Sequence, residues 1–357
     1  MDALELDTPA LYVDLDVLER NVKRMQEQCR AWGVALRPHV KTHKIAEIAQ
    51  MQLDAGAIGI TVAKLGEAEV LPGDDVLVAY PIVKPKLSRL RELAKTRTLK
   101  VAVDSVEVAR DLQGKGIETL VEIDVGVGRC GAQSPEQAVA IAQACSAFQG
   151  IFYWPSWLDE AGFQAACGKI DAVLDALAAA GFEAKIVSGG STPGAAKTPL
   201  IPRTTEIRPG TYVFYDASSL AAKVCVEADC ALRVLTTVVS TAVPGQCVID
   251  AGSKTLSSDQ TVGRGTFGHF IGRPWTIRKL NEEHGYVEPH PLTPSPFGRG
   301  GTNGESRDGE APPRVGEKVW VVPSHCCATV NLHDEIWYGR GGRVEGSWRV
   351  AARGKVR

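Results

Sequence analysis

Several features that would place a chain on nucleic acid or in a membrane are missing from this sequence. Its 40 Lys and Arg residues nearly balance 42 Asp and Glu residues, so the net charge of -2 creates no field that attracts polyanions. No run approaches the roughly 20 apolar residues of a membrane span. The first seven residues contain neither the basic nor the apolar region of a signal peptide. We therefore expect no nucleic-acid partner, no membrane association and a cytoplasmic location.

The cysteines fit the same location. Without an export signal, nine cysteines are better interpreted as reduced thiols, of which one or two serve as ligands. A chain of 357 residues with 44% apolar content exceeds the usual size of one domain, and it predicts two domains with substantial cores.

The first of these domains, residues 1–225, alternates apolar runs with helical patterns. Apolar positions at 3.6-residue spacing predict a helix from Leu18 to Trp32. Eight runs rich in branched residues follow, at 34–40, 58–62, 76–80, 101–103, 120–123, 151–153, 185–187 and 212–215. Helical stretches lie between most of them, at 84–95, 106–113, 135–147 and 163–180. Eight strands with helical connections predict an α/β fold, a (β/α)8 TIM-type barrel, with an open doubly wound sheet as the alternative.

The second domain, residues 226–357, has a different pattern of apolar residues. Short apolar runs at 234–239, 247–250, 319–322 and 343–348 are separated by Gly and Pro turns, which predicts an all-β C-terminal domain. A Pro- and Gly-rich stretch at 290–313 has no apolar period, and we interpret it as a mobile insertion.

One basic stretch, Arg37 to Lys44, places Lys41 between two histidines at the end of the first apolar run. Like-charge repulsion from its basic neighbours, together with burial, would lower the pKa of the Lys41 ammonium, as an amine that forms a Schiff base requires. The alternative is a solvated basic turn between strand and helix.

Two glycine turns follow predicted strands. The turn 125–131 places Arg129 at the mouth of the presumed barrel, although a Gly-rich turn with an arginine is more often a plain loop. The turn 188–194 follows the seventh strand, where barrels of this kind bind phosphate. Its backbone N–H groups and hydroxyls predict a phosphate site made of Gly189, Gly190, Ser191 and Thr192.

A candidate metal site lies near the C-terminus. His325 and Cys327 follow a strand-like run, in which residues i and i+2 point to one face, so they can bind one metal together. Two protein ligands leave positions for water or substrate, which suits a catalytic metal. The alternative is a buried histidine near an inert cysteine.

These segments together resemble one enzyme family. The stretch 38–44 is similar to the PHxKTHK motif of the D-threonine aldolase and D-serine dehydratase group, pyridoxal-phosphate enzymes with an alanine-racemase-type barrel. The turn 124–131 resembles their DxGxxRxG motif, and 209–216 their PGxYxFxD segment. The pair at 325 and 327, before a TVNxHD-like run, resembles their divalent-metal motif. The similarity extends from Thr8 to Gly354.

The resemblance assigns roles to residues. It implies that Lys41 carries pyridoxal 5'-phosphate as a Schiff base and acts as the catalytic lysine. The other cofactor contacts that it implies are His39, Arg129, Tyr153, Gly189, Gly190, Ser191, Thr192 and Tyr212. His325 and Cys327 would hold zinc or manganese, and a soft cysteine ligand favours zinc. The chain departs from the family at 153–157, where no histidine follows Tyr153.

The function implied is a lyase that cleaves small D-3-hydroxy amino acids with help from the metal, in a homodimer. We favour the aldolase reaction, which gives glycine and an aldehyde. The alternatives are a D-serine dehydratase-type ammonia-lyase, which uses the same parts, and a non-catalytic pyridoxal-phosphate-binding protein.

Overall fold

The computed structural model describes residues 1–112, 117–155, 159–201, 203–289 and 313–357. The chain forms two compact units. One unit, the barrel unit, contains Glu19–Val213 and Val350–Arg357. The other, the β unit, contains Met1–Leu18 and Phe214–Arg349. Most of the stretch 290–313, for which we expect a mobile insertion, lies outside the described residues.

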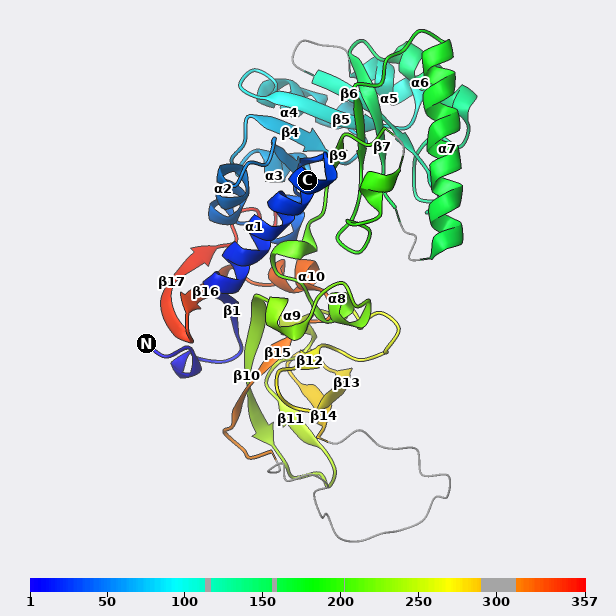
Figure 1. Ribbon diagram of the computed structural model, residues 1–357. Helices are drawn as coiled ribbons and strands as arrows, with labels where there is room; N and C mark the ends of the chain where they lie inside the picture. The colour runs from blue at the N-terminus through cyan, green and yellow to red at the C-terminus, as the bar shows by residue number, and fades with distance from the viewer. Residues whose placement is uncertain (113–116, 156–158, 202, 290–312) are drawn as a thin grey trace. The chain divides into compact units, whose positions relative to one another are not determined.

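Eight parallel strands form the barrel, as expected from the sequence (Figure 1). They are β2 (Ala35–Leu36), β3 (Ile60–Val62), β4 (Asp75–Val78), β5 (Thr98–Val103), β6 (Ile117–Ile123), β7 (Phe148–Tyr153), β8 (Ile186–Gly189) and β9 (Glu206–Ile207). The hydrogen-bonded order runs β2-β9-β8-β7-β6-β5-β4-β3. The ring closes between its two ends, because Thr61 N donates to Pro38 O at 2.8 Å and Ile58 N donates to Leu36 O at 2.9 Å. This closure excludes the open-sheet alternative.

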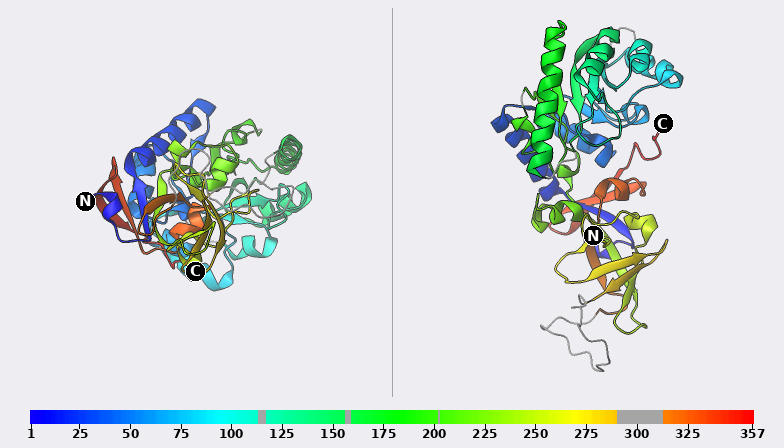
Figure 2. Two further views of the ribbon diagram at one scale, coloured as in Figure 1. Left: turned by 90° about the horizontal axis from the view of Figure 1, so that it is seen from below. Right: turned by 90° about the vertical axis from the view of Figure 1, so that its right-hand side faces the viewer.

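Helices cover the outside of the barrel. They include α1 (Leu15–Trp32, whose first turn belongs to the β unit), α2 (Ala46–Asp54), α3 (Leu65–Ala68), α4 (Leu87–Leu93), α5 (Val106–Asp111), α6 (Pro135–Ala144) and α7 (Glu160–Ala179). Ser105, Ser134 and Asp159 cap α5, α6 and α7 by accepting a backbone hydrogen bond, which explains where these helices begin. Figure 2 shows the long helix α7 beside the parallel strands. Buried residues of strands and helices make one apolar core between them.

The eighth strand is not where the apolar pattern predicts it. Residues 211–213 form a 3-10 helix, and the strand that completes the ring is the two-residue β9. Glu206 in β9 is buried and forms an ion pair with Arg37 at 3.1 Å, while Arg37 also pairs with Asp75 at 2.6 Å. A strand whose inward residue is a paired carboxylate has no apolar signal, so hydrophobicity alone cannot locate it.

The β unit is a mostly antiparallel sheet in the order β13-β14-β11-β10-β1-β16-β17, with β15 paired to β10 and β12. Its strands are β1 (Ala10–Asp14), β10 (Leu232–Ser240), β11 (Cys247–Ile249), β12 (His269–Phe270), β13 (Thr276–Leu280), β14 (Gly285–Glu288), β15 (Lys318–Val322), β16 (Glu335–Arg340) and β17 (Arg343–Arg349). Three short helices accompany them, α8 (Ala217–Ala221), α9 (Ser253–Leu256) and α10 (Cys326–Val330).

The division between units differs from the predicted boundary at residue 225. Strand β1 belongs to the β unit because it pairs with β10 and β16. The last residues belong to the barrel unit because Ala352 N donates to Lys44 O and Gly66 N donates to Arg357 O. The N-terminal residues therefore belong to the unit made mainly of residues 214–349, and the C-terminal residues belong to the unit made mainly of residues 19–213. No helix within the described ranges is long and apolar enough to cross a membrane.

Candidate active site

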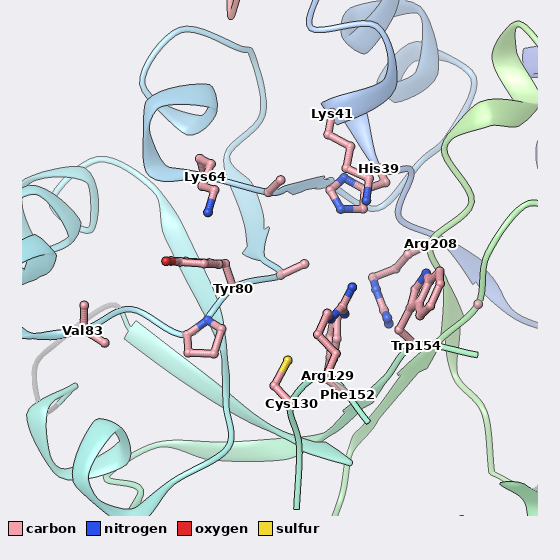
Figure 3. A pocket seen from close by; sticks show the side chains of 14 residues that line it. His39, Lys41, Lys64, Tyr80, Val83, Arg129, Cys130, Phe152, Trp154 and Arg208 are labelled. Carbon is pink, nitrogen blue, oxygen red and sulfur yellow. The ribbon is translucent and has the colours of Figure 1, made fainter. Parts of the chain in front are cut away.

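A cavity of about 460 Å³ lies at the carboxyl ends of the barrel strands. Its lining residues include Phe152 in β7 and residues of the segments that follow β2, β3, β4, β6, β7, β8 and β9. They include five basic residues, namely His39, Lys41, Lys64, Arg129 and Arg208, and Figure 3 shows these side chains around one space. This end of a barrel is where loops build active sites, and the volume is that of a small-molecule site.

Lys41 lies in the 3-10 helix Val40–Thr42 after β2, and it lines the cavity. Its side chain is exposed, so the predicted burial of Lys41 is wrong for this chain. Two of the basic residues beside it, His43 and Lys44, make contacts with other side chains. His43 Nε2 contacts Gln52 Oε1 at 3.2 Å, and the buried Lys44 pairs with Glu67 at 3.4 Å. Of the neighbours in the stretch 37–44, only His39 shares the cavity with Lys41.

His39 is neutral at physiological pH. Burial lowers its pKa well below the usual 6.5, and the nearby charges of Lys41 and Arg208 lower it further. Its Nδ1 atom is buried and has no hydrogen-bond partner among the described residues. His39 therefore contributes a neutral imidazole to the cavity wall.

Arg208 is a site residue that the sequence pattern misses. It follows β9, is fully buried, and lies 3.7 Å from the centre of the Phe152 ring. Its guanidinium donates to Ser188 Oγ at 2.5 Å and to the Tyr153 carbonyl at 2.7 Å. Burial lowers its pKa to about 10, so it still carries a positive charge at neutral pH. The sequence pattern misses Arg208 because it places the eighth strand at 212–215. An arginine at the carboxyl end of a barrel strand would otherwise have been a candidate site residue.

The loop after β6 holds Arg129 as predicted. Asp124 Oδ1 accepts hydrogen bonds from the backbone N–H groups of Gly126, Val127 and Gly128, at 2.8 to 3.1 Å. These bonds give the loop one shape, and Arg129 then reaches over the Trp154 ring, 5.2 Å from its centre. Arg129 also lies 3.6 Å from Glu122. An ordered loop thus presents a partly exposed guanidinium to the cavity.

The second glycine turn begins at the end of β8, and its Gly190 lines the cavity with a positive φ of 101°. Ser191 Oγ accepts from Gly194 N, and Thr192 Oγ1 accepts from Tyr212 N, each at 3.2 Å. A hydroxyl that accepts from the backbone keeps its own proton to donate, which suits an anion. Tyr212 is buried and its hydroxyl accepts from Gln52 at 2.8 Å, so its contact with phosphate stays a prediction.

Tyr153 does not line the cavity, contrary to the role that the resemblance implies. Alternate residues of a strand face opposite sides, and β7 presents Phe152 to the cavity while Tyr153 lies in the core between strands and helices. Its hydroxyl bonds Thr204 Oγ1 at 3.0 Å. A Cβ atom at Gly189 would overlap its ring. Tyr153 therefore packs against Gly189 from the core and does not face the cavity.

These observations fit pyridoxal phosphate. The cavity offers an amine at Lys41, the His39 imidazole and the backbone of Gly190, while the hydroxyls of Ser191 and Thr192 belong to the same turn but are not among the lining residues. The charged residues of its wall are Lys41, Lys64, Arg129 and Arg208, and no Asp or Glu is among the described residues that line it. A flat anionic molecule that carries a carbonyl group and a phosphate matches this combination of groups.

The predicted metal pair lies in the β unit. His325 occupies the N-cap position of α10 without a capping hydrogen bond from its side chain, and Cys327 is in the first turn of that helix, so the expected strand geometry is wrong. The two side chains still contact each other, and this contact, assisted by Asp259, raises the pKa of His325 to about 9. His325 Nδ1 lies 2.6 Å from Asp259 Oδ2, as in metal sites where a carboxylate orients the imidazole.

The ligand set of this pair is small. Within the described ranges, no group of three or more His, Cys, Asp or Glu side chains is arranged to hold a metal ion. An imidazole and a thiol in contact fit a divalent cation that keeps other positions open. Cys326, between them, is fully buried, and its backbone N–H donates to Asp216 Oδ2 at 3.2 Å.

Comparison with known proteins gives the family. The model "Alanine racemase, N-terminal domain" matches residues 13–218, and "Putative serine dehydratase domain" matches residues 231–338. The chain is 34% identical to 3-hydroxy-D-aspartate aldolase of Paracoccus denitrificans, over 99% of this chain and 94% of the relative.

Solved structures agree. D-threonine aldolase from Filomicrobium marinum has a TM-score of 0.85 and 31% identity, covering 99% of this chain and 98% of that one. A cysteine-to-alanine mutant of D-threo-3-hydroxyaspartate dehydratase, solved in the metal-free form, has a TM-score of 0.84 and 30% identity, covering 98% of each chain. The chain therefore belongs to the D-threonine aldolase and D-serine dehydratase family, whose pyridoxal-phosphate barrel is of the alanine-racemase type.

Proposed function

We propose that this protein is a pyridoxal-phosphate-dependent lyase that cleaves D-3-hydroxy amino acids to glycine and an aldehyde. The observation that carries the proposal is the cavity at the carboxyl ends of the strands, where Lys41, His39 and Arg208 meet the turn at Gly190. When bound, the cofactor supplies an electron sink for the carbanion left at Cα. Relatives that cleave or dehydrate D-3-hydroxy amino acids support this assignment.

Each residue has a role in this proposal. Lys41 holds the cofactor covalently and exchanges it for the substrate's amine. The turn Gly189–Thr192 binds the phosphate through backbone N–H groups and the hydroxyls of Ser191 and Thr192. His39 is neutral and packs against the cofactor, and Arg129 and Arg208 supply positive charge on the wall of the cavity.

The pair His325 and Cys327 holds a divalent metal in this proposal, zinc in preference to manganese. Such an ion would bind the substrate's 3-hydroxyl and make its proton easier to remove. Asp259 orients the imidazole of His325. A relative whose cysteine variant was solved in a metal-free form supports the presence of a metal.

The test is product analysis with separate substrates. Holoenzyme incubated with D-threonine should release glycine and acetaldehyde in equal amounts. The dehydratase alternative, supported by the dehydratase among the relatives, predicts ammonia and an oxo acid from D-serine or D-threonine instead. Bound cofactor without either set of products would refute both lyase functions and leave a cofactor-binding protein.

A further inference from the structure

Glu122 is a buried carboxyl beside the active-site cavity that the functions assigned above do not use. It lies near the end of β6, its side chain is 4% exposed, and it pairs in register with Phe152 of β7. Residues paired across neighbouring strands face the same side of a sheet, so Glu122 faces the barrel interior together with Phe152. Because Phe152 lines the cavity, the Glu122 carboxyl lies next to the cavity wall.

The two groups that contact this carboxyl belong to the loop after β6. Cys130 Sγ donates to Glu122 Oε1 at 3.3 Å, and Arg129 Nη2 lies 3.6 Å from the same oxygen. Both loop residues line the cavity, and Figure 3 shows them on its wall. Within the described residues, no further ion pair or hydrogen bond reaches the Glu122 side chain. A buried carboxylate is unstable without a cation, so Arg129 stabilises the negative charge of Glu122.

The charges around Glu122 make this pairing mutual. Burial raises the pKa of the Glu122 carboxyl, and the charge of Asp104 acts in the same direction. The Cys130 thiol and the charges of Arg129 and Arg208 act against this rise. Loss of the Arg129 charge would therefore favour the protonated carboxyl. Loss of the Glu122 charge would leave Arg129 without an anionic partner in the part of the chain that the structure describes.

The two arginines of the cavity wall are supported in similar ways. Arg208 donates to Ser188 Oγ, and Ser188 in turn donates to the buried Glu206 at 2.6 Å. Arg129 instead meets Glu122 directly. Arg208 is fully buried, whereas 54% of the Arg129 side chain is exposed, so Arg129 has more conformational freedom to lose. Arg129 therefore depends more on its carboxylate for a fixed position.

Glu122 acts through Arg129 and not on a ligand. A second cavity beside the main one is lined by Glu122 together with Arg129, Cys130 and Trp154, among others, and its volume is about 10 Å³. Such a space holds about one water molecule at most. Glu122 restrains the Arg129 guanidinium on one side, and the Trp154 ring, 5.2 Å away, restrains it on another. A cation that is ordered beforehand loses little freedom when an anion binds.

We infer that Glu122 is a positioning residue, whose carboxylate holds the Arg129 guanidinium at the cavity wall, ready to meet an anionic group of the bound cofactor or substrate. The identity of that anionic group rests on the proposed function. The contact between Glu122 and Arg129 does not, so the two can be tested separately.

Chemical modification tests the contact in the full-length protein without cofactor. Phenylglyoxal reacts with the neutral form of a guanidine, and a neighbouring carboxylate favours the charged form. Glu122→Gln should therefore raise the rate of modification at Arg129, followed by mass spectrometry, by about two- to fivefold, the range for a partly exposed ion pair. Glu122→Asp keeps the charge and should change the rate less. Arg203, which pairs with Asp171 and Asp175, is the internal control and should react at the same rate in every variant.

A double-mutant cycle tests the positioning role in holoenzyme. With D-threonine as substrate, Glu122→Gln should lower kcat/KM by about five- to twentyfold, the range for residues in contact. In an Arg129→Met background the same change should have less than about a twofold further effect, because the group that Glu122 positions is gone. Glu118→Gln is the matched control. Glu118 lies on the same strand but pairs with Lys100 at 3.1 Å, so its loss should leave kcat/KM within about twofold of wild type.

An unchanged rate of modification at Arg129 would overturn the inference, as would an equal loss of kcat/KM in the presence and absence of Arg129, which indicates a purely structural role. If Glu122→Gln does not fold, Glu122→Asp supplies the same comparison with smaller changes in the same direction. If wild-type holoenzyme cleaves no D-3-hydroxy amino acid, the proposed function fails. Cofactor affinity in the same four proteins then replaces kcat/KM in the cycle, and the modification rates still decide whether Glu122 holds Arg129.

Discussion

Replacing Gly189 by alanine tests how the phosphate turn is built. A Cβ atom at this position would lie closer than 3.0 Å to ring atoms of Tyr153, whereas carbon atoms in contact need about 3.5–4.0 Å. The ring is fully buried in the core between strands and helices, so it has no space into which to retreat. Overpacking of this kind costs about 1–3 kcal/mol. Displacing the ring also breaks its hydrogen bond to Thr204, worth about 1 kcal/mol.

The expected loss for Gly189→Ala is thus about 2–4 kcal/mol in the free energy of unfolding. Urea unfolding of cofactor-free protein measures it without a contribution from cofactor affinity. Gly168→Ala is the control, since Gly168 is exposed in α7 with no atom near its Cβ position, and it should stabilise by about 0.5–1 kcal/mol. Combining Gly189→Ala with Tyr153→Leu should cost less than the sum of the two single changes. A Gly189→Ala protein within about 0.5 kcal/mol of wild type would refute the packing argument.

Four further predictions concern the cofactor and the metal. Lys41→Ala should abolish the visible absorption band of the bound cofactor, and a borohydride-reducible adduct that persists in this variant would contradict the assignment. The double change Ser191→Ala and Thr192→Ala should weaken cofactor affinity, since each hydroxyl gives a charge-assisted hydrogen bond of about 1.5–3 kcal/mol, and unchanged affinity would move the phosphate elsewhere. A chelator should remove lyase activity but leave the cofactor band, as should His325→Ala. Cys327→Asp should shift the preferred metal from zinc towards manganese, and full activity of metal-free protein would refute a catalytic metal.

The barrel could be predicted from the sequence because most of its strands are apolar runs separated by capped helices. Strand β9 could not, since it has two residues and its Glu206 is buried through an ion pair with Arg37. The run at 212–215 is more apolar but is buried without joining the sheet. Apolar content measures burial, and only the backbone pairing distinguishes a strand from another buried segment.

The positions of Lys41, Arg129 and Gly190 at the cavity were predictable, because a motif fixes the backbone there, while their roles stay predictions. Side-chain direction was harder to predict. Tyr153 and Trp154 are neighbours, yet only Trp154 lines the cavity, because the register of β7 sends the tyrosine outward. His325 and Cys327 contact each other at the start of a helix and not along a strand. Their proximity was therefore predictable, but the alternation of side chains along a strand is not its cause. The exposure of Lys41 depends on how the loop after β2 turns, which composition does not determine.

The pairing of β1 has a consequence for synthesis on the ribosome. Ala10 pairs with Leu235, so this apolar strand emerges early and waits for more than two hundred further residues before its partner exists. At about 5–20 residues per second, the wait is on the order of 10 to 45 s. During that time every barrel strand is made, while β1 remains an unpaired edge of the kind that promotes aggregation. A fragment intended to fold as the barrel alone should accordingly begin near Glu19, because one that begins at Met1 carries a strand without its sheet.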